Sequence, residues 1–317
     1  MGYLRLKLAE FFGLVDTEAE ARDLFWRAKF DGADFQCPRC CHEGYYSFST
    51  RPEVRRCRQC GKEVRVRAGT ILEHSKKSLL VWARAIFLMM QDKRGVSALH
   101  VQRELSLKSY GTVWGMLHKV RRALEQRDDR YKLHGTVELD GASFGREAPY
   151  RKGRRSKVQS STPRAAREVL IAVETKGWVD DKGRPKERAG FAKVVVSRET
   201  SIFAQRFADA SLSAGTMVNT DGGASFIGLE GFDVEHQTML AQPERLNQWL
   251  PWVHRFISNA KSWIIGTHHA VKAQYLARYL AEHTYRFNRR HDPDGLFHRA
   301  LTACALASPV RLCVLSG

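Results

Sequence analysis

The sequence is poor in acidic residues relative to basic ones. It has 34 aspartate and glutamate residues against 52 lysine and arginine residues, which gives a formal net charge of +18. The chain is also 43% hydrophobic, and this excludes a disordered polyelectrolyte and favours a globular protein. A globular chain with so large a positive charge is expected to have a polyanionic partner, and nucleic acid is the first candidate.

The sequence lacks a hydrophobic run that is long enough to cross a membrane. Its most apolar stretch, residues 79–90, is interrupted by Arg84 and falls short of the roughly 20 apolar residues that a spanning helix needs. The N-terminal apolar stretch is interrupted by charges, unlike a signal peptide. We therefore expect a cytoplasmic protein without a membrane partner, in which seven cysteines favour metal binding or free thiols over disulfides.

Four of the cysteines form two CxxC pairs near the N-terminus. The motifs CPRC and CRQC have the separation of two zinc knuckles that are joined by a β-hairpin. Cys41 and His42 follow the first knuckle, and either could compete as a ligand. Because cysteine side chains would fill all four coordination positions of the ion, the pattern predicts structural rather than catalytic Zn²⁺. The predicted ligands are Cys37, Cys40, Cys57 and Cys60.

The middle of the sequence has helical periodicity. Residues 78–92 predict a buried helix, and Ser97 is placed to begin a short helix that ends near Leu105. A turn, SLKS, precedes a second helix over 109–122. This arrangement is typical of a helix-turn-helix, in which the second helix reads DNA. The basic residues expected to contact DNA from that helix are Lys119, Arg121 and Arg122.

From residue 134 the apolar pattern changes to a period of two, which is typical of strands. The predicted elements follow in the order of three strands, a helix, a strand, a helix, a strand and a helix. This is the order of an RNase H-like domain, an α/β fold whose mixed sheet is flanked by helices. The segments that carry this interpretation are the strands 134–145, 167–179, 189–199, 215–221 and 232–237, and the helices 199–210 and 252–290.

A basic segment, residues 146–165, separates the first two predicted strands. Its first nineteen residues hold seven basic residues and one acidic residue, together with proline, glycine and serine. That composition predicts an exposed loop that binds DNA phosphates. The residues expected to make these contacts are Arg151, Lys152, Arg154 and Arg155.

Two aspartates stand where strands would present them to a metal ion. Asp140 lies within the first predicted strand, and Asp221 ends a later one before two glycines. Carboxylates on neighbouring strands can converge on a hard divalent ion such as Mg²⁺, which assists phosphodiester chemistry. Glu138 shares a face of its strand with Asp140 and is an alternative acid.

Several motifs along the chain together resemble those of a known protein family. The two CxxC motifs, the helix-turn-helix, and the blocks VELDG, NTDGGASF, ISNAKSWIIGTHH and YLARYLAEHTYRFNRR resemble a bacterial insertion-sequence transposase of the zinc-ribbon DDE type, ISXO-like. The resemblance implies binding to terminal inverted repeats, metal-dependent DNA cleavage, and attack of the freed 3′-hydroxyl on target DNA. It also implies a homodimer or larger assembly on double-stranded DNA in a bacterial nucleoid.

The resemblance assigns roles to particular residues. Asp140 and Asp221 match the first two catalytic acids. The third position varies among glutamate, asparagine and histidine, with a lysine seven residues later, so it falls on His254 with Lys261. Seven residues are two helical turns, which places both on one face, whereas Asn259 is a rival on another face. The implied ion is Mg²⁺ or Mn²⁺, and an imidazole ligand suits manganese better.

Three other functions remain open from the sequence. One is a zinc-ribbon and helix-turn-helix regulator that binds DNA without cutting it, and another is a transposase copy that is catalytically inactive. The third is an RNase H-like nuclease that acts on RNA or on DNA junctions. The expected domain organisation is a helical segment at 1–30, a zinc ribbon at 31–72, a helix-turn-helix region at 76–128, a catalytic domain at 134–292, and a C-terminal tail at 293–317.

Overall fold

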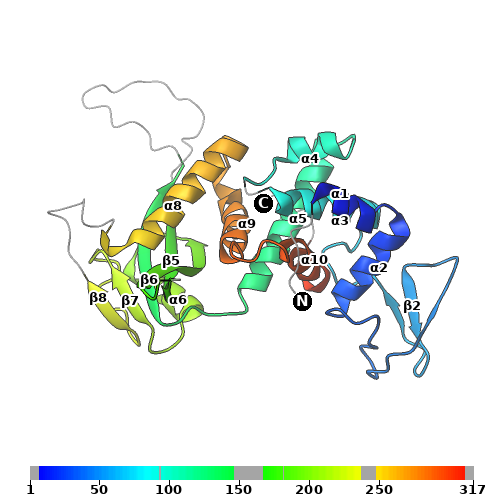
Figure 1. Ribbon diagram of the computed structural model, residues 1–317, viewed down its shortest axis with the longest axis horizontal. Coiled ribbons are helices and arrows are strands. Elements are labelled where there is room, and N and C mark those ends of the chain that lie inside the picture. The colour runs from blue at the N-terminus through cyan, green and yellow to red at the C-terminus, as the bar shows by residue number, and fades with distance from the viewer. Residues whose placement is uncertain (1–6, 93, 146–166, 181, 237–247, 311–317) are drawn as a thin grey trace. The chain divides into compact units, whose positions relative to one another are not determined.

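The computed structural model describes two compact units of the chain (Figure 1). Unit 1 combines Met1–Asp128 with Arg289–Gly317, and unit 2 is Asp129–Asn288. The chain therefore leaves unit 1 after α5 and returns to it near the C-terminus. The residues that the structure describes are 7–92, 94–145, 167–180, 182–236 and 248–310.

Unit 1 is a helical body with a small antiparallel sheet in the order β1-β2-β3. The chain forms the sheet where the cysteine pairs were expected to enclose a hairpin. The strands are β1 (Tyr45–Ser47), β2 (Val54–Cys57) and β3 (Glu63–Arg65). The helices are α1 (Leu8–Leu14), α2 (Glu18–Lys29), α3 (Leu79–Gln91), α4 (Ala98–Glu104), α5 (Tyr110–Asp128) and α10 (Leu296–Leu306).

Buried cations attach the small sheet to helix α2. The guanidinium of Arg55, on β2, lies over the rings of Trp26 and Tyr45 at 4.5 and 4.3 Å. Lys29 Nζ, at the end of α2, donates to the carbonyl oxygens of Arg65 and Val66 at 3.1 and 3.3 Å. These contacts orient a sheet that is too small to bury a core of its own.

The three predicted helices of the middle region are present. Ser78, Ser97 and Ser109 each accept a hydrogen bond from the backbone N–H three residues later, at 3.2, 3.1 and 3.3 Å. Each serine therefore satisfies one of the free donors at a helix start, and the capping role predicted for Ser97 is confirmed. Helix α5 continues to Asp128, beyond the expected end at residue 122.

The segment that was expected to be a C-terminal tail contains a packed helix. Helix α10 lies against α2, α3 and α5. Phe297 contacts the rings of Phe11 and Phe87, with centroids 5.3 and 5.7 Å apart. An ion pair between Arg289 and Asp128, at 2.7 Å, joins the two points where the chain crosses the boundary of unit 1. Apolar residues at helical spacing explain the packing, and burial of Phe297 requires the core that α3 and α1 supply.

Unit 2 is built on a mixed sheet of five strands in the order β6-β5-β4-β7-β8. Strand β5 pairs antiparallel with both β4 and β6. Strand β7 pairs parallel with β4 on one side and with β8 on the other. The strands are β4 (Thr136–Phe144), β5 (Arg167–Val179), β6 (Pro185–Val196), β7 (Met217–Thr220) and β8 (Asp233–His236).

Helices cover both faces of this sheet. Helices α8 (Pro251–Trp263) and α9 (Leu276–Asn288) share a core with Ile171 and Val173 of β5. Helix α6 (Ser201–Ser211) shares the opposite core with Val137 and Leu139 of β4. The alternation that placed Val137 and Leu139 on one face of their strand is confirmed, and so is a mixed sheet flanked by helices.

The predicted helix over 252–290 is interrupted. Helix α8 ends at Trp263, a π-helical turn follows over Ile264–His268, and α9 starts only after a short 3₁₀ turn. His269 has a positive φ of 58°, which the α-helix does not accommodate, so the chain turns at this point. The segment predicted to be helical over 252–290 is therefore divided into two helices, α8 and α9.

The link between β7 and β8 also differs from the expected order of elements. Residues 221–232 form turns and irregular structure where that order has a helix. Gly222, Gly228 and Gly231 have positive φ values of 75–81°, which interrupt helical geometry. Strand β6 starts at Pro185 rather than at residue 189.

Among the described residues, no helix has the length and apolar character that crossing a bilayer requires.

Candidate metal centre and active site

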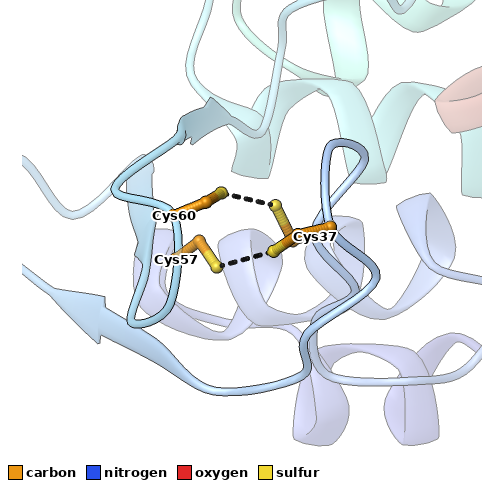
Figure 2. A group of neighbouring side chains, drawn as sticks. Cys37, Cys57 and Cys60 are labelled. Atoms are coloured by element: carbon orange, nitrogen blue, oxygen red, sulfur yellow. Dashed lines mark hydrogen bonds between the residues drawn. The ribbon is translucent and has the colours of Figure 1, made fainter.

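The four predicted zinc ligands converge in unit 1 (Figure 2). Their sulfur atoms all lie within 4.8 Å of one another, and the Cys37–Cys60 and Cys40–Cys57 pairs are both 3.5 Å apart. Four sulfurs bound tetrahedrally at 2.3 Å from zinc would stand about 3.8 Å apart, so the donor set fits Zn²⁺. Cys41 is exposed and lies outside this group.

The two knuckles have the same backbone form. The N–H of Cys41 donates to the carbonyl oxygen of Cys37, and the N–H of Gly61 donates to that of Cys57, at 2.9 and 3.1 Å. Cys41 and Gly61 both have positive φ, 57° and 69°. Each turn therefore presents two sulfurs in one direction, and glycine removes the strain in the second.

Asp140 and Asp221 extend from neighbouring parallel strands. The register of β4 and β7 pairs Glu138 with Asn219, and both aspartates stand two residues further along. In a parallel pair this places the two carboxylates at the same level, beyond the carboxyl end of β7. The N–H of Gly223 donates to Asp221 Oδ1 at 2.9 Å, which fixes the direction of that side chain.

His254 of α8 contacts Asp140. His254 Nε2 lies 3.2 Å from Asp140 Oδ2, and the two side chains are 22% and 14% exposed. The hydrogen bond to Asp140 raises the pKa of His254, the charges of Asp140, Glu138 and Asp221 add to this, and burial opposes it. The structure thus brings together a carboxylate and an imidazole from two distant segments, as two groups that can share a proton or a cation.

Asp221 does not join Asp140 and His254 in a group as compact as the four cysteines. Among the described residues, the four cysteines are the one group of three or more candidate ligands whose atoms all lie within 4.8 Å of one another. Asp140, Asp221 and His254 therefore do not form so compact a set. Trp249 Nε1 donates to the carbonyl oxygen of Thr220 at 2.9 Å and so ties the end of β7 to the segment before α8.

Glu138 determines where helix α8 begins. Its Oε2 accepts hydrogen bonds from the backbone N–H groups of Trp252 and Val253, both at 2.8 Å. The residue before α8 is Leu250, which has no side-chain oxygen, so a strand residue supplies the acceptor that a helix start needs. Glu138 is 2% exposed. Burial raises its pKa to about 7, while these two hydrogen bonds oppose the rise.

Lys261 and Asn259 are the other two candidates on α8. Lys261 is exposed, and its Nζ lies 5.6 Å from the centre of the Phe144 ring at the end of β4. Asn259 is also exposed. Of the two rivals for the third position, His254 is the one that contacts Asp140.

Glu199 is a carboxylate near Asp140 that sequence reasoning missed. A Cβ atom on Gly141 would lie 1.8 Å from Glu199 Oε2, so the glycine leaves room for this side chain. Burial raises the pKa of Glu199, and the charges of Asp140 and Asp221 raise it further. Glu199 lies in a loop after β6, where periodicity carries no information. The one sequence signal is a glycine directly after Asp140.

The basic residues expected to read DNA from α5 have other contacts. Arg121 is only 1% exposed, so its predicted role in DNA binding gains no support from an exposed position and stays a prediction. Lys119 Nζ donates to the carbonyl oxygen of Ile71 at 3.0 Å, and Arg122 pairs with Glu125 at 2.6 Å. The four predicted contacts of the basic loop, Arg151, Lys152, Arg154 and Arg155, lie outside the described residues.

Removing one zinc ligand tests the modular role of the metal. We expect Cys37→Ser to lower bound zinc and to open the β1–β3 sheet to proteolysis and amide hydrogen exchange, because three thiolates no longer close the site. Exchange in unit 2 should be unchanged. Cys41→Ser is the matched control and should retain zinc. Loss of protection throughout unit 2 in Cys37→Ser would contradict a self-contained zinc module.

The pKa of Glu138 predicts how stability depends on pH. Its folded pKa of about 7 lies above the ordinary value of 4.5, so the folded protein retains a proton that the unfolded chain releases. The free energy of unfolding should therefore fall as pH rises through this window, by up to about 3 kcal/mol from this group. Glu138→Gln should remove that part of the dependence in urea unfolding followed by circular dichroism at several pH values.

A second substitution separates the charge of Glu138 from its hydrogen bonds. Glu138→Gln keeps an oxygen that can accept from the start of α8, whereas Glu138→Ala leaves two N–H groups without this acceptor. We expect Glu138→Ala to lower the free energy of unfolding by about 1–3 kcal/mol relative to Glu138→Gln at pH 5. Equal stability of the two variants would show that the contact does not hold the helix.

Comparisons with known proteins identify a family for most of unit 2. Residues 132–288, nearly all of unit 2, match the family model described as the ISXO2-like transposase domain. A protein of Halobacterium salinarum, described as an uncharacterized protein in transposable element ISH50, is 27% identical over 106 residues. That alignment covers 33% of this chain and 34% of the relative, so the chain spans about a third of the relative's length. No solved structure gives a significant match. Through residues 132–288, the chain belongs to the family of ISXO2-like insertion-sequence transposases.

Proposed function

We propose that the chain binds the terminal inverted repeats of an insertion sequence and catalyses metal-dependent DNA cleavage and strand transfer. The observation that carries this proposal is the contact between Asp140 and His254, at 3.2 Å, inside the matched transposase domain. Asp221 follows the neighbouring parallel strand at the same level. A carboxylate on β4, a carboxylate after β7 and an imidazole on α8 supply the acidic and imidazole donors that a divalent ion needs.

The Asp140–His254 pair fits two adjacent ligands of one divalent ion. Two ligand atoms at 2.1 Å from an octahedral ion stand about 3.0 Å apart, close to the observed 3.2 Å between Oδ2 and Nε2. When bound, a divalent ion polarises the scissile phosphodiester and stabilises charge on the leaving oxygen. Asp221 would complete the site by a small movement or through water. The mixture of oxygen and nitrogen donors favours manganese over magnesium.

His254 has to be neutral to bind a metal ion. The hydrogen bond to Asp140 raises its pKa and so favours the charged imidazolium in the protein without metal. Metal binding then requires release of that proton. Lys261, two helical turns further along α8, is positioned to hold a phosphate of the DNA on the same face of the helix. Glu138 sets the start of α8 and thereby the positions of both residues.

The architecture of the chain supports the rest of the proposal. Three antiparallel strands followed by two parallel ones, with helices on both faces, fit an RNase H-like catalytic domain. The zinc ribbon and the α4–α5 pair are proposed to bind the element ends as a ribbon and a helix-turn-helix. Because transposition joins two ends, we propose a dimer or larger assembly on double-stranded DNA.

A strand-transfer assay tests the catalytic residues. With a duplex that carries the element end, we expect activity with Mn²⁺ or Mg²⁺. Asp140→Asn, Asp221→Asn and His254→Ala should each lower the rate by at least about 100-fold, the upper range for groups that only support a metal site. Asn259→Ala is the control on the same helix and should retain activity.

The outcome also separates the alternative functions. Full activity in His254→Ala together with loss in Asn259→Ala would transfer the third position to Asn259. End binding without cleavage under any divalent ion would favour a DNA-binding regulator or an inactive copy. Retention of strand transfer by Asp140→Asn would contradict the proposed mechanism.

A further inference from the structure

Strands β5 and β6 extend beyond the rest of their sheet as a two-stranded arm. Strand β4 pairs with β5 only as far as the Thr136–Thr175 pair. Beyond that point β5 and β6 continue to pair with each other through four more residues of each strand, 176–179 with 185–188. Residues 177–179 and 184–188 are exposed. We call the described residues of this hairpin, 176–180 and 182–188, the β5–β6 arm.

Charge is segregated between the two faces of the β5–β6 arm. Directly paired residues of antiparallel strands share a face, and alternate residues along a strand do as well. One face therefore carries the pairs Lys176–Arg188 and Trp178–Lys186, which are three bases and an indole. The other face carries the pairs Gly177–Glu187 and Val179–Pro185, which include one acid and no base.

The β5–β6 arm is held in a defined shape at both ends. At its tip, Asp180 Oδ1 accepts from the backbone N–H groups of Lys182 and Arg184 at 3.0 and 2.9 Å, and Arg184 also pairs with its carboxylate. At its base, Lys176 Nζ lies 3.2 Å from Glu174 Oε2 and 4.9 Å from the Phe191 ring centre. The backbone of a closed hairpin of this kind loses little conformational freedom on binding, because its shape is already defined.

We propose that the basic face of the β5–β6 arm binds the phosphate backbone of double-stranded DNA. Lys186 and Arg188 are exposed, and Trp178, which pairs with Lys186, is 42% exposed. Among the described residues, this face carries no acid between Asp180 at the tip and Glu174 at the base. Two cations beside an indole match a sugar–phosphate backbone, in which charged oxygens alternate with apolar sugar surface. A two-stranded ribbon also has the width that the major groove admits. The proposal rests on DNA being the partner of this transposase and adds a contact surface to it.

The charge pattern favours DNA over a protein partner for this face. A surface that docks a second copy of a chain with net charge +18 would bring like charges together. The apolar residue Val179 is 65% exposed, but it lies on the opposite face from the bases. Binding of the basic face to an anionic polymer places negative charge beside Lys186 and Arg188 and so adds attraction instead of repulsion.

Equilibrium binding to DNA at several salt concentrations tests the proposal. The full chain is titrated against a short duplex of arbitrary sequence, and the double variant Lys186→Gln, Arg188→Gln is compared with the unaltered protein. The slope of log K against log salt is negative, and each lost phosphate contact reduces its magnitude by about one. The double variant should therefore reduce the magnitude of the slope by about two. Weakening should be similar for all duplex sequences. Trp178→Ala should weaken binding with little change in slope.

Substitutions on the opposite face provide the control. Glu187→Gln raises the net charge by one and should leave the slope unchanged, because its side chain points away from the bound face. Circular dichroism and gel filtration of each variant check fold and self-association. A double variant with unchanged affinity and slope overturns the proposal, and so does one that loses self-association but binds DNA normally. If the unaltered chain binds no DNA, the proposed function itself fails, which is a distinct result.

Discussion

The contact between Glu138 and the start of α8 is the interaction on which the geometry of the transposase domain depends. A buried strand residue accepts two backbone N–H groups of a helix that begins 113 residues later in the chain. The partial positive charge of the free N–H groups at the helix start favours the carboxylate and opposes the effect of burial, which raises its pKa. Since the next residue on the same face of β4 is Asp140, one strand both anchors the helix and presents a carboxylate to His254. The geometry of the candidate site follows from this spacing of two residues.

The proposed use of His254 as the third residue of the site, after Asp140 and Asp221, is consistent with the carboxylates around it. Carboxylates of Asp140, Glu138 and Asp221 all raise the pKa of His254, so their negative charge already dominates this end of the sheet. Glu199 adds a further carboxylate beside Gly141. Another acid on α8 would increase the repulsion within this group, whereas an imidazole donates a hydrogen bond to Asp140 and can instead bind a metal ion when neutral.

The sequence predicted those parts of the structure that depend on local pattern. The alternation of Val137 with Glu138 located the buried and polar faces of β4, serines marked helix starts, and CxxC spacing predicted convergent thiolates. Contacts between distant segments were not predictable in this way. Nothing local indicated that Arg121 would be buried, or that Glu138 would bind the start of α8. The residues of the basic loop lie outside the described part of the chain, so their role stays a prediction.

The proposal that Asp140 and His254 bind one divalent ion is tested most directly by an anomalous-scattering map of crystals of the protein grown with Mn²⁺. The account predicts a manganese peak about 2.1–2.2 Å from a carboxylate oxygen of Asp140 and from His254 Nε2, with Asp221 bound directly or through water. A peak bound by Asp140 and Asp221 with His254 turned away, or saturating Mn²⁺ without a peak at Asp140, would contradict it.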